Sequence, residues 1–165
     1  LLLLYHKFMA LCYFFGTRYE KRYYMEKSTD ELMKILNSKK SYNEFFEEEV
    51  GELCFSSVAD YLEVLLNEKH LKKSDVIRKS NLDKNYAYQI FNGNKLNPSR
   101  NKMLMLAFGM ELSLNETRKL LKVCCLPDLY VRSPRDSIII FGLNKKMSLI
   151  DVNESLSDFS FEILE

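Results

Sequence analysis

Polar side chains between positions 84 and 89 have the chemistry needed to read DNA bases. They belong to Lys84, Asn85, Tyr88 and Gln89. The amides of asparagine and glutamine donate and accept hydrogen bonds at once, so that either can grip adenine through two bonds, whereas lysine favours guanine acceptors and phosphates. On a helix, these side chains would point away from Ala87, Ile90 and Phe91. The pattern therefore predicts recognition of bases and not catalysis.

Two short helices joined by a tight turn would present these side chains. Apolar residues at spacings of three and four place one apolar face on each helix, with Val76 and Ile77 on the first. The turn contains Asn81, the non-glycine type that best tolerates a left-handed backbone. Asp83 suits the N-cap of the second helix, which we expect to end at Asn92-Gly93.

Residues 72–100 resemble the helix-turn-helix of lambda-repressor-like, Cro/C1-type (XRE family) regulators. Aligned on Asn92-Gly93, the family motif begins at Lys73 and places its turn glycine at Asn81. Ile77 is larger and Ala87 smaller than the usual residues, which we interpret as an exchange of volume across one contact. The resemblance implies a five-helix DNA-binding domain in a bacterial, sequence-specific regulator of transcription, with double-stranded DNA as its partner.

The resemblance also implies which residues contact DNA. The recognition helix would span about residues 83–92, and basic residues flanking it would bind phosphates. From their position beside Ala87, we expect Tyr86 and Tyr88 to stack on sugars or contact phosphates, with packing of one of them against the helix end as the alternative. The predicted set is Lys73, Ser74, Lys84, Asn85, Tyr86, Tyr88, Gln89, Asn94, Lys95, Ser99 and Arg100.

Basic charge is concentrated around this motif. Residues 69–102 hold nine Lys and Arg against two Asp, a net charge of +7, whereas the whole chain carries +1. Such a local excess is the electrostatic footprint of a DNA-binding surface. The alternatives are a solvated run of lysines, and a pair of amphipathic helices of the kind found in many all-helical proteins.

The composition predicts an all-α chain, because Gly (5) and Pro (3) are scarce and alternating strand patterns are nearly absent. Residues 1–24 begin with an apolar run that is too short for a spanning helix, which needs about 20 residues. We interpret 1–24 as an upstream or non-native extension before a natural start at Met25, with membrane association as the alternative. Residues 25–56 read as a helical leader arm that could pack or make dimer contacts.

The predicted DNA-binding domain covers residues 57–125, with five helices that should form their own core. Residues 126–165 form a C-terminal helical extension of net charge −3, from four basic and seven acidic residues. Ser133-Pro134 begins one of its helices, and the apolar residues between Ile138 and Leu143 exceed what one helix face needs. We expect this surplus to form a homodimer or to bind a protein partner, and a fragment ending at Cys125 to be a folded monomer.

Catalytic and metal-binding patterns are not found in the sequence. The histidines, His6 and His70, lack metal-ligand spacing, and the four cysteines form no C-x-x-C pair. The adjacent Cys124 and Cys125 could sense oxidants, although small buried residues are the commoner case. We therefore expect no enzymatic activity, metal or cofactor.

Two functions of different class follow. The first is a cytoplasmic transcriptional regulator that binds DNA as a homodimer. The alternative is a protein-interaction module or an antitoxin-like regulator, in which the helix-turn-helix is mainly a scaffold. The exposed Lys84, Asn85 and Gln89 favour DNA. The sequence does not indicate the operator, an effector, the genes controlled, or whether the protein activates or represses.

Overall fold

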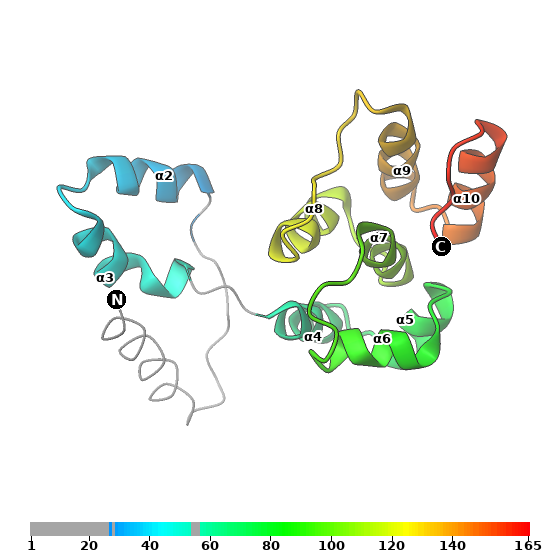
Figure 1. The fold of residues 1–165 in the computed structure, drawn as a ribbon, viewed down its shortest axis with the longest axis horizontal. Helices are drawn as coiled ribbons and strands as arrows, with labels where there is room; N and C mark the ends of the chain where they lie inside the picture. Colours follow the sequence, from blue (N-terminus) through cyan, green and yellow to red (C-terminus); the bar gives the residue numbers. More distant parts are fainter. Residues whose placement is uncertain (1–26, 28, 54–56) are drawn as a thin grey trace. The chain divides into compact units, whose positions relative to one another are not determined.

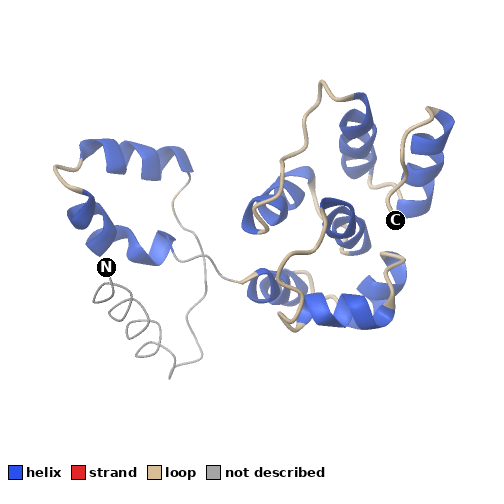
Figure 2. Cartoon of the chain, in the orientation of Figure 1, coloured by secondary structure: helices blue, strands red, loops and turns tan. Residues whose placement is uncertain are grey.

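The computed structural model describes residues 27, 29–53 and 57–165. In these residues, helices are joined by loops and turns, and no strand is present (Figure 2). The predicted all-α class is confirmed for these residues. The predictions for 1–24 and for Cys54 lie outside them. The helices are α2 (Thr29–Ser38), α3 (Tyr42–Leu53), α4 (Val58–Glu68), α5 (Lys73–Lys79), α6 (Lys84–Phe91), α7 (Arg100–Gly109), α8 (Leu114–Val123), α9 (Pro134–Lys145) and α10 (Leu149–Asp158).

The chain forms two compact units, residues 1–54 and 55–165. In the first unit, α2 packs against α3 (Figure 1). Phe45 of α3 is buried, and the carboxylate of the buried Glu49 accepts a hydrogen bond of 2.6 Å from Lys27 Nζ. The leader arm predicted at 25–56 is therefore a pair of helices over its described residues.

Most helices of the second unit begin at a residue whose side chain caps the helix. Ser57–Asp60, Ser113–Glu116 and Ser148–Asp151 each form a capping box, in which the serine hydroxyl and the acidic side chain satisfy backbone N–H groups reciprocally. Asp83 caps α6, and Ser133 caps α9 with Pro134 in its first turn. Each cap gives partners to N–H groups that have none within the helix.

Most of these helices end in the same way. A non-glycine residue adopts a left-handed backbone, an apolar residue follows it, and the N–H of that apolar residue bonds back to a carbonyl five residues earlier. The left-handed residues are His70, Glu111, Cys125, Lys146 and Ser160, with φ between 53° and 58°. Asn81 (φ 52°) and Gly93 (φ 73°) are left-handed too, as the sequence predicts.

Helix α7 lies in the middle of the second unit, where Figure 1 shows it surrounded by its neighbours. Every residue from Met103 to Met110 is buried. Helices α5, α8 and α10 pack against it. An all-round apolar sequence such as MLMLAFG suits a helix that is enclosed on all sides.

The predicted C-terminal extension belongs to this same unit. Leu129, Ile139, Val152 and Leu164 are buried in one core with the residues of α7. Residues 57–125 and 126–165 therefore share a core, and a fragment that ends at Cys125 would uncover α7. The reason is that α10, which lies within residues 126–165, packs directly against α7.

The apolar run at Ile138–Leu143 is largely used within the chain, which differs from the predicted surplus. Ile139 and Leu143 are buried, and the two remaining isoleucines are half-buried against the core. Phe141 remains 57% exposed. Most of the surface expected to bind a second copy thus packs inside one chain.

Gly109 permits the close approach of α5 and α7. A Cβ atom at this position would lie 2.7 Å from Ser80 Cβ and 2.7 Å from the carbonyl oxygen of Val76. Gly109 is the last residue of α7, but the residue that takes the left-handed conformation after it is Glu111. Gly109 is needed for space and not for a left-handed conformation.

We predict that Gly109→Ala lowers the free energy of unfolding by about 1–3 kcal/mol, because the added methyl group pushes α5 away from α7. Combining it with Ser80→Gly should recover part of this loss, since one of the clashing atoms is removed. Urea unfolding of the single and double variants measures this coupling.

Gly142→Ala provides the matched control, because its Cβ would meet Val152 of α10 and not Ser80. The decrease in the free energy of unfolding caused by Gly142→Ala should simply add to the decrease caused by Ser80→Gly. If the effects of Gly109→Ala and Ser80→Gly on the free energy of unfolding were also additive, α5 and α7 would not meet at this point.

Candidate nucleic-acid interface

Helices α5 and α6 form a helix-turn-helix whose inner faces are fixed by packing. Val76 and Ile77 of α5 are buried, as are Ala87 and Ile90 of α6. The hydroxyl of the buried Ser80 donates a 3.0 Å hydrogen bond to the carbonyl of Ile77 and so ends α5 at the turn. The backbone orientation of α6 is therefore set by its apolar side.

The opposite side of α6 carries the predicted base-reading residues. Lys84, Asn85 and Gln89 are exposed, and the last two lie one helical turn apart. Tyr86 and Tyr88 are half-buried and border this polar face. The structure thus brings together the five predicted residues of the recognition helix on one accessible surface.

Lysines gather around the ring of Tyr86. The Nζ atoms of Lys95 and Lys102 lie 5.6 Å and 5.9 Å from its centroid. Both distances suit attraction between a cation and the face of an aromatic ring. Lys102 was not in the predicted set, since only the position of the first turn of α7 beside α6 brings it to this ring.

A third lysine approaches the other end of α6. Lys73 Nζ lies 5.7 Å from the centroid of the buried Phe91 ring. Lys73 was predicted to contact DNA, and it is half-exposed here. Three lysines from α5, the α6–α7 loop and α7 therefore lie along α6.

A shallow pocket of about 300 Å³ separates α5 from α6. Its lining residues are Ser74, Ile77, Arg78, Lys84 and Tyr88. Ser74, Lys84 and Tyr88 were predicted, whereas Arg78 was not. Arg78 pairs with Asp75 at 3.6 Å on the exposed surface of α5, a contact that is worth little in water.

The loop after α6 is tied at both ends. Lys95 N–H donates to the carbonyl of Gln89 at 3.0 Å, and the Ser99 hydroxyl caps α7 through Lys102 N–H. Asn94 and Ser99 are both exposed. The two predicted loop residues thus lie on the surface between α6 and α7.

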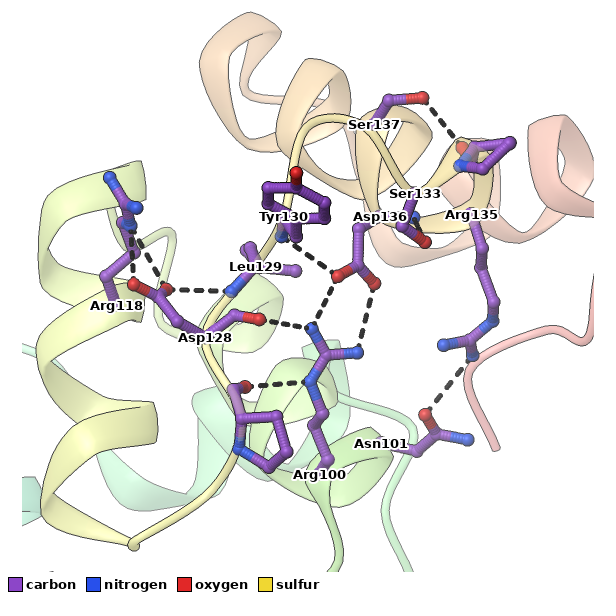
Figure 3. Close-up of polar contacts among 12 residues, drawn as sticks. Arg100, Asn101, Arg118, Asp128, Leu129, Tyr130, Ser133, Arg135, Asp136 and Ser137 are labelled. Atoms are coloured by element: carbon purple, nitrogen blue, oxygen red, sulfur yellow. Dashed lines mark hydrogen bonds and ion pairs between the residues drawn. The ribbon is translucent and has the colours of Figure 1, made fainter.

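Arg100 is placed differently from the prediction, as Figure 3 shows. Its guanidinium donates to both carboxylate oxygens of Asp136, at 3.0 Å and 2.8 Å. It also donates to the carbonyls of Pro127 and Asp128, at 3.0 Å and 3.1 Å. The donors of Arg100 are thus directed to groups within the chain, and its predicted contact with DNA stays a prediction.

Asp136 is the buried partner in this contact, with 7% of its surface exposed. Burial raises the pKa of its carboxyl, but the hydrogen bonds from Arg100 and from the N–H of Tyr130, together with the charge of Arg100, lower it by more, so that the net pKa lies below its ordinary value. The pair is therefore ionised at neutral pH.

The remaining basic side chains of the motif leave a positive surface. Of the nine between residues 69 and 102, four pair with acids, namely Lys69, Arg78, Lys79 and Arg100. Within residues 27, 29–53 and 57–165, no ion pair involves the other five, which are Lys72, Lys73, Lys84, Lys95 and Lys102. These five lysines are available to an anionic partner.

The comparisons with known proteins give no relative. No family model, no curated protein and no solved structure matches the chain. Among the described residues, no group of three or more His, Cys, Asp or Glu is arranged to hold a metal ion, and no helix is long and apolar enough to cross a membrane.

The adjacent cysteines differ in their surroundings. Burial raises the pKa of the Cys124 thiol to about 12, and repulsion from the neighbouring Cys125 makes a smaller contribution in the same direction. Cys125 is exposed at the left-handed end of α8. The thiolate is the reactive form of cysteine, so that Cys124 is protected against alkylation.

We predict that iodoacetamide at pH 8 modifies Cys125 and spares Cys124 in the folded protein. A thiol with a pKa near 12 is ionised in only about one molecule in ten thousand at this pH. Tandem mass spectrometry of the digested protein locates the modification. Denaturation in urea is the control, since it should make both residues react, and equal labelling in the folded state would contradict the burial of Cys124.

Proposed function

We propose that this chain is a sequence-specific, double-stranded DNA-binding regulator of transcription. The observation that carries the proposal is the outer face of α6, where Lys84, Asn85 and Gln89 are exposed opposite a fully buried apolar face. The lysines around Tyr86 and Phe91 support it, because they place positive charge along the same helix.

In the proposed complex, α6 lies in the major groove of DNA, which is about 12 Å wide and admits one helix. Asn85 and Gln89 would grip base edges through their amides. Lys73, Lys95 and Lys102 would neutralise phosphates on either side. Base contacts would supply specificity, whereas phosphate contacts would supply affinity and orientation.

The proposal extends to the fold and to the family. Five helices, α4 to α8, follow one another in the chain. We propose that they form a lambda-repressor-like domain of the XRE type with α5 and α6 as its helix-turn-helix, and the motif at residues 72–100 supports this proposal. A bacterial regulator of this type would act in the cytoplasm.

We expect two copies to bind one operator, because a single recognition helix covers few base pairs. Half-sites would then form an inverted repeat about 34–36 Å apart.

Phe141, the exposed remainder of the apolar run, is the residue of α9 that we would place in the contact between the two copies. Phe141→Glu should convert a dimer to a monomer in sedimentation velocity, whereas a monomeric parent protein would contradict the proposal.

Specificity and affinity should separate when the two groups of residues are changed. Asn85→Ala or Gln89→Ala should cost about 1–3 kcal/mol on a duplex selected from random sequences, with little effect on unrelated DNA. Lys95→Gln or Lys102→Gln should weaken both, and should each reduce the log–log salt slope by about 0.9. Fluorescence anisotropy over a range of salt concentrations measures both quantities.

Asn115→Ala is the matched control, because Asn115 is an exposed asparagine in the first turn of α8. It should leave specific and non-specific binding unchanged. Equal affinity of the parent protein for every duplex, or binding that salt does not weaken, would overturn the proposed function.

A further inference from the structure

The first turns of α7 and α9 hold each other through side chains from both helices, an arrangement that we name the α7–α9 clamp. It consists of Arg100, Asn101, Arg135 and Asp136 (Figure 3). Arg100 of α7 donates twice to Asp136 of α9. Arg135 of α9 donates to the amide oxygen of Asn101 in α7 at 3.2 Å. Each helix thus contributes a cation and an acceptor.

The clamp is fixed from the side of the C-terminal helices. The Asp136 carboxylate also accepts the N–H of Tyr130 at 3.0 Å. Arg135 donates to the carbonyl of Glu162 at 2.8 Å, near the end of the chain. The following segment is held as well, since the side-chain amide of Asn153 exchanges two hydrogen bonds with the backbone of Leu164.

The other side of the clamp leads to the candidate interface. Arg100 is the first residue of α7 and directly follows the loop that leaves α6. Lys102, two residues further on, lies over the ring of Tyr86, as does Lys95 of the loop. A displacement of the first turn of α7 would move these lysines away from α6.

We infer that Arg100 is a positioning residue, through which the C-terminal helices hold the lysines of the DNA-binding surface against α6; this inference rests on the proposed function. The predicted alternative is a direct contact between Arg100 and phosphate. The geometry favours positioning, because four hydrogen bonds already engage the guanidinium and its side chain is 20% exposed.

Two conservative variants distinguish a positioning role of Arg100 from a direct contact with phosphate. Arg100→Lys keeps the charge that a phosphate would need but loses the paired geometry toward a carboxylate. Asp136→Asn leaves the arginine in place, but removes the negative charge and one of the two carboxylate oxygens that accept its hydrogen bonds. Arg118→Gln is the matched control, because Arg118 makes an ion pair of 3.0 Å with Asp128 in the same region. Among the described residues, its side chain makes no hydrogen bond or ion pair with α7.

The measurements are the affinity for the selected duplex over a range of salt concentrations, and amide hydrogen exchange of residues 94–102 without DNA. We expect Arg100→Lys and Asp136→Asn to weaken binding at least tenfold and to accelerate exchange at Lys95 and Lys102. Both variants should also reduce the salt slope, although neither removes a positive charge, because the displaced lysines would no longer neutralise phosphates. Arg118→Gln should behave as the parent protein in both measurements.

The inference is overturned if Asp136→Asn binds as the parent does, or if Arg100→Lys retains affinity while Arg100→Gln loses it together with about 0.9 of the salt slope. If the Asp136 variant does not fold, Asn101→Ala breaks only the neutral half of the clamp. It should accelerate exchange at Lys95 and Lys102, and unchanged exchange in a folded Asn101→Ala protein would again overturn the inference.

Failure of the proposed function has a different result. A parent protein that selects no DNA sequence would remove the proposed function, whereas the exchange measurement would still report whether the clamp holds residues 94–102. If the parent protein binds DNA selectively and residues 94–102 of the variants exchange their amide hydrogens at the rates of the parent, only the positioning role is contradicted.

Discussion

The enclosure of α7 is the constraint on which the second unit depends. A helix that is apolar all round must be covered on every side, and the cover here comes from both halves of the unit, with α5 and α8 before the predicted boundary and α10 after it. Gly109 and Gly142 show how tightly the neighbouring helices approach, since a Cβ on either would overlap an adjacent residue. Packing of this kind would let the C-terminal helices influence α5 and α6 at a distance, because protein interiors transmit small displacements.

The ion pair between Arg100 and Asp136 is partly buried, with the arginine 20% exposed. Removing one partner of a fully buried pair typically destabilises a protein by about 3–5 kcal/mol, so the loss for this pair should be smaller. The pH dependence follows from the lowered pKa of Asp136. A carboxyl whose pKa is lower in the folded than in the unfolded state contributes stability above its unfolded value of about 3.9. That contribution is lost as the pH falls through the folded pKa, so the clamp is complete throughout the neutral range.

Local chemistry in the sequence predicted the local structure well. Asp83 and Ser133 cap the helices that they were expected to begin, and Asn81 and Gly93 take the left-handed conformations expected of them. These features depend on residues within one or two turns. The role of Gly109, the place of Lys102 beside Tyr86, and the partner of Arg100 36 residues away could not be predicted, because they depend on how distant helices pack. A surplus of apolar residues at Ile138–Leu143 was visible in the sequence, but whether a neighbouring helix or a second chain covers it was not.

Ion pairs with acidic residues reduce the positive charge that the motif presents on its surface. A net charge of +7 over residues 69–102 counts all basic residues equally. Four of them are already opposed by acids, so the surface that remains is formed by five lysines, three of which are held over aromatic rings. An ammonium group held over a ring loses less freedom on meeting a phosphate than one on a freely moving side chain, because ordering a long side chain costs on the order of 1–2 kcal/mol. The aromatic residues of α6 would thus contribute to affinity for an anionic partner by ordering its lysines in advance, even where their rings never touch that partner.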